Sequence, residues 1–167
     1  TTWQRLLDPA EPMHVALAEI DGRVVGFVHF IEHRSCWSER NSIYLQDLST
    51  GSRELVSSQK GINGGPAFSP DGTQLAMNLS YGGSPDVYVM DLASRKTRKV
   101  TSHFAIDVEP VWTPDGQRLV FTSDRSGKPQ LYEVPASGGD ASRLTFQGQY
   151  NARATICCDG KKIAMAQ

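Results

Sequence analysis

A repeat of 44 residues is the feature that most constrains the fold. The segment Pro66-Ala-Phe-Ser-Pro-Asp-Gly72 returns as Pro110-Val-Trp-Thr-Pro-Asp-Gly116 and, more faintly, as Ala154-Thr-Ile-Cys-Cys-Asp-Gly160, so the three final glycines lie 44 residues apart. A second series keeps this spacing: Ile43-Tyr-Leu-Gln-Asp-Leu48, Val87-Tyr-Val-Met-Asp-Leu92 and Leu131-Tyr-Glu-Val-Pro135. A third follows the Asp-Gly pairs: Leu75-Ala-Met77, Leu119-Val-Phe121 and Ile163-Ala-Met165. Three series in one register indicate a chain built from repeated units of one kind.

Each unit reads as four short strands. A strand near Ala67–Ser69 leads into the turn Pro70-Asp-Gly72, because Asp-Gly between apolar runs is a strong signal for a tight turn. Further strands are expected at Gln74–Leu79, Asp86–Asp91 and Thr97–Thr101. Four strands with a period in the forties are typical of a β-propeller blade. The sequence therefore predicts an all-β fold of antiparallel four-stranded blades.

Composition narrows the possible partners. There are 17 basic and 18 acidic residues, giving a formal net charge of −1. Nucleic-acid binding needs a clustered basic excess, and a membrane helix needs about 20 apolar residues in a row, so we expect neither kind of partner. Residues Thr1–Ala10 carry charges and Pro9 and show no apolar signal-peptide core. Three cysteines, an odd number, do not suggest a disulfide framework.

Residues 43–167 resemble the TolB-type β-propeller family. The motifs that carry the resemblance are Ala67-Phe-Ser-Pro-Asp-Gly72, Val87-Tyr-Val-Met-Asp-Leu92, Phe121-Thr-Ser-Asp-Arg-Ser-Gly127 and Arg143-Leu-Thr145. The resemblance implies a non-enzymatic protein-binding role in the Tol–Pal envelope system, with a peptidoglycan-associated lipoprotein as partner in the periplasm. It implies six blades in the parent fold, of which this chain carries fewer than four.

Residues 3–48 resemble a second family. The stretch Val25-Gly-Phe-Val-His-Phe-Ile-Glu-His-Arg-Ser-Cys-Trp-Ser38, followed by Tyr44-Leu-Gln-Asp-Leu48, is similar to the central strands of GNAT-type acetyltransferases. Strands are expected at His14–Ile20 and Arg23–Glu32 around an Asp21-Gly22 turn. The glycine-rich loop that would hold the acetyl-CoA pyrophosphate at a helix N-terminus is missing, and Ser49-Thr-Gly-Ser-Arg-Glu-Leu-Val56 stands in its place.

These two resemblances suggest a chimera, engineered or natural, with an acetyltransferase-like fragment at residues 1–48 and propeller repeats at 43–167. The strands before residue 57 would then form one hybrid four-stranded blade, giving a partial propeller of about 3.5 blades. An open strand edge invites pairing with another copy, so a homo-oligomer, most simply a dimer, is expected. The alternative hypothesis is a remnant acetyl-CoA-dependent N-acetyltransferase, and a weaker one is an accessory domain of a hydrolase.

The loops that enter each blade are the candidate functional surface. Gly61-Ile-Asn-Gly64, Ala105-Ile-Asp-Val108 and Gln149-Tyr-Asn-Ala152 are equivalent in the repeat, and such loops gather at one mouth of a propeller channel. Their polar and aromatic side chains suit partner binding, but the simpler interpretation is that they only cap the blades, because a propeller needs such loops whatever it does. The predicted partner-binding residues are Asn63, His103, Asp107, Glu109, Tyr150 and Asn151.

Other candidate chemistry has a simpler structural explanation. The Asp-Gly pairs (Asp71, Gly72, Asp115, Gly116, Asp159 and Gly160) are predicted to be structural turns, since Asp accepts backbone hydrogen bonds there. His29 and His33 would share one strand face while Glu32 points away, and Cys36 follows in a loop, so a metal site is not predicted. Ser57-Ser-Gln-Lys60 fits the Ser-x-x-Lys pattern of a catalytic serine, but the partner motifs and the helix of that catalytic site are missing. We therefore expect no catalytic residue, metal or cofactor.

Overall fold

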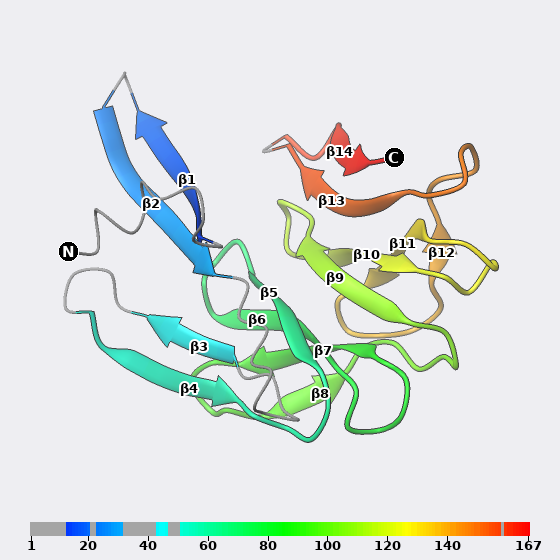
Figure 1. The fold of residues 1–167 in the computed structure, drawn as a ribbon, viewed down its shortest axis with the longest axis horizontal. Coiled ribbons are helices and arrows are strands. Elements are labelled where there is room, and N and C mark those ends of the chain that lie inside the picture. The colour runs from blue at the N-terminus through cyan, green and yellow to red at the C-terminus, as the bar shows by residue number, and fades with distance from the viewer. Residues whose placement is uncertain (1–12, 21–22, 32–42, 47–50, 158) are drawn as a thin grey trace. The chain divides into compact units, whose positions relative to one another are not determined.

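The computed structural model describes residues 13–20, 23–31, 43–46, 51–157 and 159–167 of the chain, and every regular element among them is a β-strand (Figure 1). The chain divides into two compact units, Thr1–Trp37 and Ser38–Gln167. Each unit is described separately. None of the described residues forms a helix that could span a lipid bilayer.

The first unit contains one hairpin. Strands β1 (Met13–Ile20) and β2 (Arg23–Ile31) pair antiparallel, with Met13 opposite Ile31 and Ile20 opposite Arg23. The ladder has one irregularity between Ala18 and Glu19. Both strands lie where the sequence predicts them, and the Asp21-Gly22 pair that joins them lies outside the described residues.

The second unit repeats a four-stranded antiparallel sheet. Two sheets are complete, and their strand orders are β5-β6-β7-β8 and β12-β11-β10-β9. Two-stranded sheets precede and follow them in the sequence, β3-β4 and β13-β14. The strands are β3 (Ile43–Gln46), β4 (Arg53–Ser57), β5 (Asn63–Phe68), β6 (Gln74–Leu79), β7 (Asp86–Asp91), β8 (Thr97–Lys99), β9 (Asp107–Trp112), β10 (Arg118–Ser123), β11 (Gln130–Pro135), β12 (Ser142–Arg143), β13 (Ala152–Ile156) and β14 (Ile163–Ala166).

The ladders differ from the predicted hybrid blade. β1 pairs with β2 and β3 pairs with β4, so these four strands form two separate two-stranded sheets among the described residues. Ile43 of β3 lies 44 residues before Val87 of β7, and Arg53 of β4 lies 44 residues before Thr97 of β8. β3 and β4 therefore occupy the third and fourth strand positions of a blade. Each of these strands therefore pairs with its neighbour in the sequence, β1 with β2 and β3 with β4.

The predicted Asp-Gly segments lie in turns of one geometry. The N–H of Gly72, Gly116 and Gly160 donates to the carbonyl three residues earlier, at 2.9, 2.9 and 2.8 Å, and the three φ angles are +70°, +69° and +71°. This left-handed conformation favours glycine. Asp71 Oδ1 accepts from Ser69 Oγ at 2.5 Å and from Thr73 N at 3.1 Å. Cys157 replaces the Ser or Thr in the last turn, but its backbone bonds remain, because they need no side chain.

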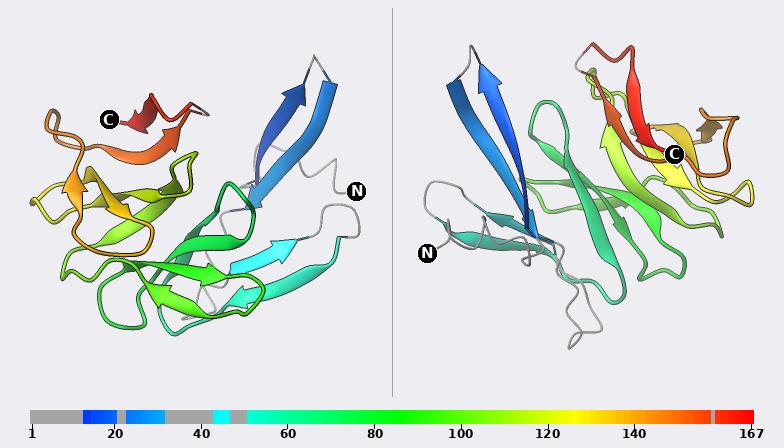
Figure 2. Two further views of the ribbon diagram at one scale, coloured as in Figure 1. Left: turned by 180° about the vertical axis from the view of Figure 1, so that it is seen from behind. Right: turned by 45° about the horizontal axis from the view of Figure 1, so that its top comes forward.

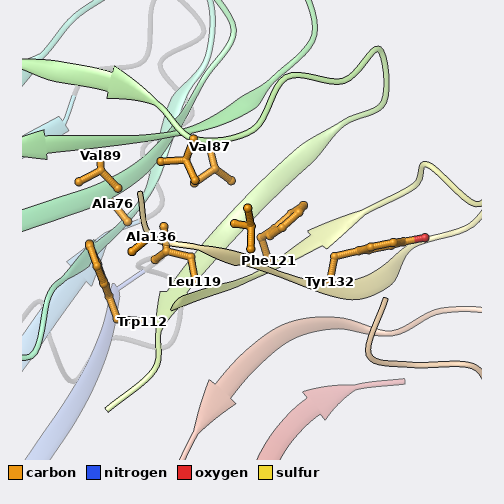
Figure 3. Close-up of a cluster of buried hydrophobic side chains, with 10 residues drawn as sticks. Ala76, Val87, Val89, Trp112, Leu119, Phe121, Tyr132 and Ala136 are labelled. Carbon is orange, nitrogen blue, oxygen red and sulfur yellow. The ribbon is translucent and has the colours of Figure 1, made fainter. Parts of the chain in front are cut away.

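Neighbouring blades are joined by an apolar layer. Ala76, Val87 and Val89 of the first complete blade pack with Leu119 and Phe121 of the second (Figure 3). The opposite face of the first blade forms a second cluster: Leu75, Met77, Leu79, Tyr88 and Met90 pack with Ile43. Both faces of β6 and β7 are thus buried, which explains why they read as nearly continuous apolar runs rather than strict alternations. Burial of each large aliphatic side chain contributes about 1.5–3 kcal/mol.

Candidate partner-binding face

The antiparallel strand order places alternate connections at opposite ends of the blades. The first strands of successive blades, β5, β9 and β13, lie side by side (Figures 1 and 2). The Asp-Gly turns follow these strands at one end. At the other end lie the segments that enter β5, β7, β9, β11 and β13, and we call these five segments the loop face: 58–62, 80–85, 100–106, 124–129 and 144–151.

Three of the predicted site residues are buried at the inner edge of the loop face. Asn63, Asp107 and Asn151 lie 44 residues apart, and their exposed fractions are 4%, 0% and 0%. Asn63 Oδ1 accepts from Ser57 Oγ at 2.7 Å and from Gln59 N at 3.0 Å. Its Nδ2 donates to Gln59 O at 2.7 Å. These side chains hold the loops in place.

Asp107 has a cation where its equivalents have neutral partners. Arg125 Nη2 donates to Asp107 Oδ2 at 2.8 Å, and the guanidinium carbon lies 4.9 Å from the ring centroid of Tyr132 and 5.4 Å from that of Phe121. In the next blade, Asn151 Nδ2 donates to Gln130 Oε1 at 3.0 Å. A buried carboxylate is stable only with a paired charge, which Arg125 supplies.

Glu109 lies in β9 and has an unusual backbone conformation. Its φ is +57°, and Gly65 and Arg153, 44 residues to either side, have φ of +57° and +56°. The ladders are irregular around these positions in all three first strands. Glu109 Oε1 accepts from Arg153 Nε at 3.2 Å and Oε2 accepts from Thr122 Oγ1 at 3.2 Å. The bulges therefore turn Glu109 and Arg153 toward each other and join adjacent blades.

His103 is partly exposed and fixes its own loop. Its backbone N–H donates to Asp86 Oδ1 at 3.2 Å, and its Nδ1 accepts from Ala105 N at 3.1 Å. Its ring lies against Phe104, with centroids 4.2 Å apart. Phe104 is 87% exposed, so His103 supports an aromatic side chain that reaches into solvent.

An exposed apolar series on the loop face was missed by sequence reasoning. Ile62, Ile106 and Tyr150 each precede one of the buried Asn or Asp residues, and their exposed fractions are 44%, 48% and 47%. Only Tyr150 was predicted. The repeated pair Ile-Asn, Ile-Asp and Tyr-Asn at 44-residue spacing was the signal that could have revealed the other two.

Two further aromatic side chains extend this series, Phe104 and Phe146, the latter 75% exposed. We call the five residues Ile62, Phe104, Ile106, Phe146 and Tyr150 the apolar rim. Lys60 and Lys128 are exposed on the same loops, and the acidic Asp124 on these loops accepts from Ile106 N at 2.9 Å. Clustered exposed apolar groups are typical of a protein-binding surface.

No arrangement for metal binding is present in the part of the chain that the structure describes, where no three His, Cys, Asp or Glu side chains gather. Glu32, His33 and Cys36 lie outside the described residues, as does the side chain of His29. Ser57 Oγ donates to Asn63 and is buried, so it supports a loop.

The repeated four-stranded antiparallel blades define a segment of a β-propeller. A family model described as "TolB beta propeller domain" matches residues 5–167, so the chain belongs to this family. The Tol-Pal system protein TolB of Xanthomonas oryzae pv. oryzae (strain PXO99A) is 58% identical over 164 residues, which is 98% of this chain and 36% of that protein. TolB of Xanthomonas campestris pv. campestris (strain B100) is 57% identical over the same shares.

A solved structure shows the same fold. The crystal structure of TolB from Acinetobacter baumannii has a TM-score of 0.72 and 50% sequence identity, and the match covers 78% of this chain and 33% of that one. The all-β, partial-propeller fold predicted from the repeats is confirmed. The chain spans about a third of the length of the relatives it matches.

The comparisons give no support to the second resemblance. The family match begins at residue 5, and the relatives align over 98% of the chain, so both include the segment predicted to be acetyltransferase-like. A chimera, an engineered origin, an acetyltransferase activity and a homo-oligomer are all unsupported. The boundaries 1–48 and 43–167 remain predictions.

Proposed function

We propose that this chain is a non-enzymatic protein-binding segment of a Tol–Pal type envelope system, and that its loop face binds a Pal-like lipoprotein. The observation that carries the proposal is the apolar rim. Three of its side chains recur at the 44-residue spacing, each anchored by a buried Asn or Asp that follows it in sequence. Membership of the TolB propeller family supports the choice of partner class.

The chemistry of the loop face favours a partner that presents apolar side chains together with carboxylates. Ile62, Ile106 and Tyr150 offer apolar area, while Lys60 and Lys128 add exposed positive charge. Aromatic side chains at the centre of an interface contribute much of the binding energy, and surrounding charges mainly raise the association rate. Of the six predicted partner-binding residues, Tyr150 would contact the partner, while buried Asn63, Asp107 and Asn151 would position the loops.

A binding titration tests the proposal. The soluble domain of a Pal-type lipoprotein is titrated against the chain and against the variants Ile106→Ala and Tyr150→Ala, and each variant is expected to weaken binding by about 1–2 kcal/mol. Leu55→Ala is the matched control, because Leu55 is 51% exposed within β4 and is not part of the loop face. Equal affinity for all four proteins, or the absence of binding to the unaltered chain, would contradict the proposal.

A further inference from the structure

The Asn-Gly pair Asn63-Gly64 directly follows Ile62 and forms the start of β5. In such a pair the backbone nitrogen of the glycine can attack Cγ of the asparagine side chain. The amide leaves as ammonia, a five-membered succinimide forms, and water opens it to aspartate or isoaspartate. Glycine allows this attack because it has no side chain to obstruct it and adopts many backbone conformations. We propose that Asn63 is a site of spontaneous deamidation that the folded loop protects.

The folded state holds both reacting groups away from the ring-closing geometry. Asn63 is 4% exposed, and four hydrogen bonds fix its side-chain amide. Its Oδ1 accepts from Ser57 and Gln59, and its Nδ2 donates to Gln59 O at 2.7 Å and to Gly61 O at 3.2 Å. Gly64 pairs within the β5-β6 ladder. Attack therefore requires local opening of this segment, so the reaction reports how often it opens.

The product would not fit the folded loop. A carboxylate in place of the Asn63 amide would face the carbonyl oxygens of Gln59 and Gly61 without a hydrogen to donate. The chain accommodates a carboxylate at the equivalent position in the next blade, where Arg125 pairs with Asp107. The residue equivalent to Arg125 in the blade of Asn63 is Tyr81, which is neutral. Deamidation would therefore bury an uncompensated charge and loosen the loop.

The repeat supplies two controls. Asn151 occupies the same position one blade further on from Asp107 and is equally buried, but Ala152 follows it. Gly64→Ala slows the attack without a clash, because an added Cβ would lie 3.5 Å from Asn78 Nδ2, an ordinary contact. Gly64 does not have the positive φ that would strain an alanine.

The first experiment follows deamidation in the intact chain by peptide mapping with mass spectrometry, in mildly alkaline buffer and in urea. Asn63 is expected to convert in urea and to convert more slowly, by about tenfold or more, in buffer. Asn151 in the unaltered chain and Asn63 in Gly64→Ala are expected to change little. Equal rates at Asn63 in buffer and urea would overturn the protection, and no conversion in urea would overturn the site itself.

The second experiment tests the consequence with Asn63→Asp, alone and combined with Tyr81→Arg. The single variant is expected to lower the urea midpoint of unfolding, and the added arginine to recover part of that loss. An unchanged midpoint in Asn63→Asp would overturn the claim that deamidation loosens the loop. If Asn63→Asp does not fold, the time courses of the unaltered chain still decide the modification site. Neither experiment depends on the proposed partner, so a failure here is distinguishable from a failure to bind a Pal-like lipoprotein.

Discussion

One exchange between equivalent blades shows how single residues set the chemistry of the loop face. In the first complete blade Tyr81 stacks on Tyr88, with ring centroids 5.4 Å apart. In the second, Arg125 takes the place of Tyr81 and lies over Tyr132, the equivalent of Tyr88. Asn63 and its counterpart Asp107 change with them. The second blade thus has an ion pair at two positions that hold neutral residues in the first, and both blades keep an aromatic residue beside them.

Removal of Arg125 tests this pairing. Arg125→Gln leaves the fully buried Asp107 without its cation, and the free energy of unfolding is expected to fall by about 3 kcal/mol. Arg118→Gln is the control, because the Arg118–Glu133 pair is 38% and 28% exposed and should matter by less than about 1 kcal/mol. Urea unfolding measures the loss of unfolding free energy in both variants. Similar losses in the two variants would show that the Asp107–Arg125 pair has no special role.

The turn carboxylates make a prediction about acid stability. The hydrogen bond from the Ser69 hydroxyl, with smaller contributions from Thr73, lowers the pKa of Asp71 below its ordinary value of 3.8. Because the folded pKa is the lower one, the stabilisation is present above about pH 4 and is lost as the pH falls through the folded pKa. Ser69→Ala is expected to raise the Asp71 pKa toward 3.8 in a carbon-detected NMR titration, with Asp115 as the unchanged reference. An unaltered Asp71 titration would mean that the hydroxyl is not the main cause.

At the scale of the elements, Trp112 connects two first strands. Its indole Nε1 donates to Ala67 O of β5 at 3.0 Å, and the side chain is 9% exposed in the layer between the blades. Trp112→Phe removes the donor and keeps an aromatic ring, so a loss of about 1 kcal/mol in unfolding free energy is expected. Phe68, the equivalent residue of β5, is 55% exposed, and Phe68→Leu should change stability by less than about 0.5 kcal/mol. Equal losses of unfolding free energy in Trp112→Phe and Phe68→Leu would contradict the role of Trp112 in connecting β5 and β9.

Strand prediction succeeded where apolar spacing decides the structure. The predicted Gln74–Leu79 and Asp86–Asp91 coincide with β6 and β7. The first strand was expected to begin near Ala67, because Asn63-Gly-Gly-Pro66 reads as a loop in the sequence. In the structure β5 begins at Asn63. Its pairing includes a bulge at Gly65, whose positive φ no propensity rule anticipates. β8 ends at Lys99 because the N–H groups of both Val100 and Thr101 point to Val87 O.

For the whole molecule, the period of the repeat predicted the architecture better than it predicted the site. A fixed spacing carries over from blade to blade, so it identified which loops meet at one face. It did not reveal which side chains those loops bury. Asn63 and Asp107 look like exposed polar residues in sequence, and only the hydrogen bonds that close around them show that they anchor the loops. Ile62 and Ile106 look like core residues, yet they are exposed.

The hydrogen-exchange rates of the loop face with and without a soluble Pal-type lipoprotein domain test the central claim most directly. We predict that bound partner slows exchange in segments 58–62, 100–106 and 144–151, while the Asp-Gly turns at the opposite end of the blades exchange as before. Protection confined to the Asp-Gly turns, or no protection at a saturating partner concentration, would contradict the assignment of the apolar rim as the binding surface.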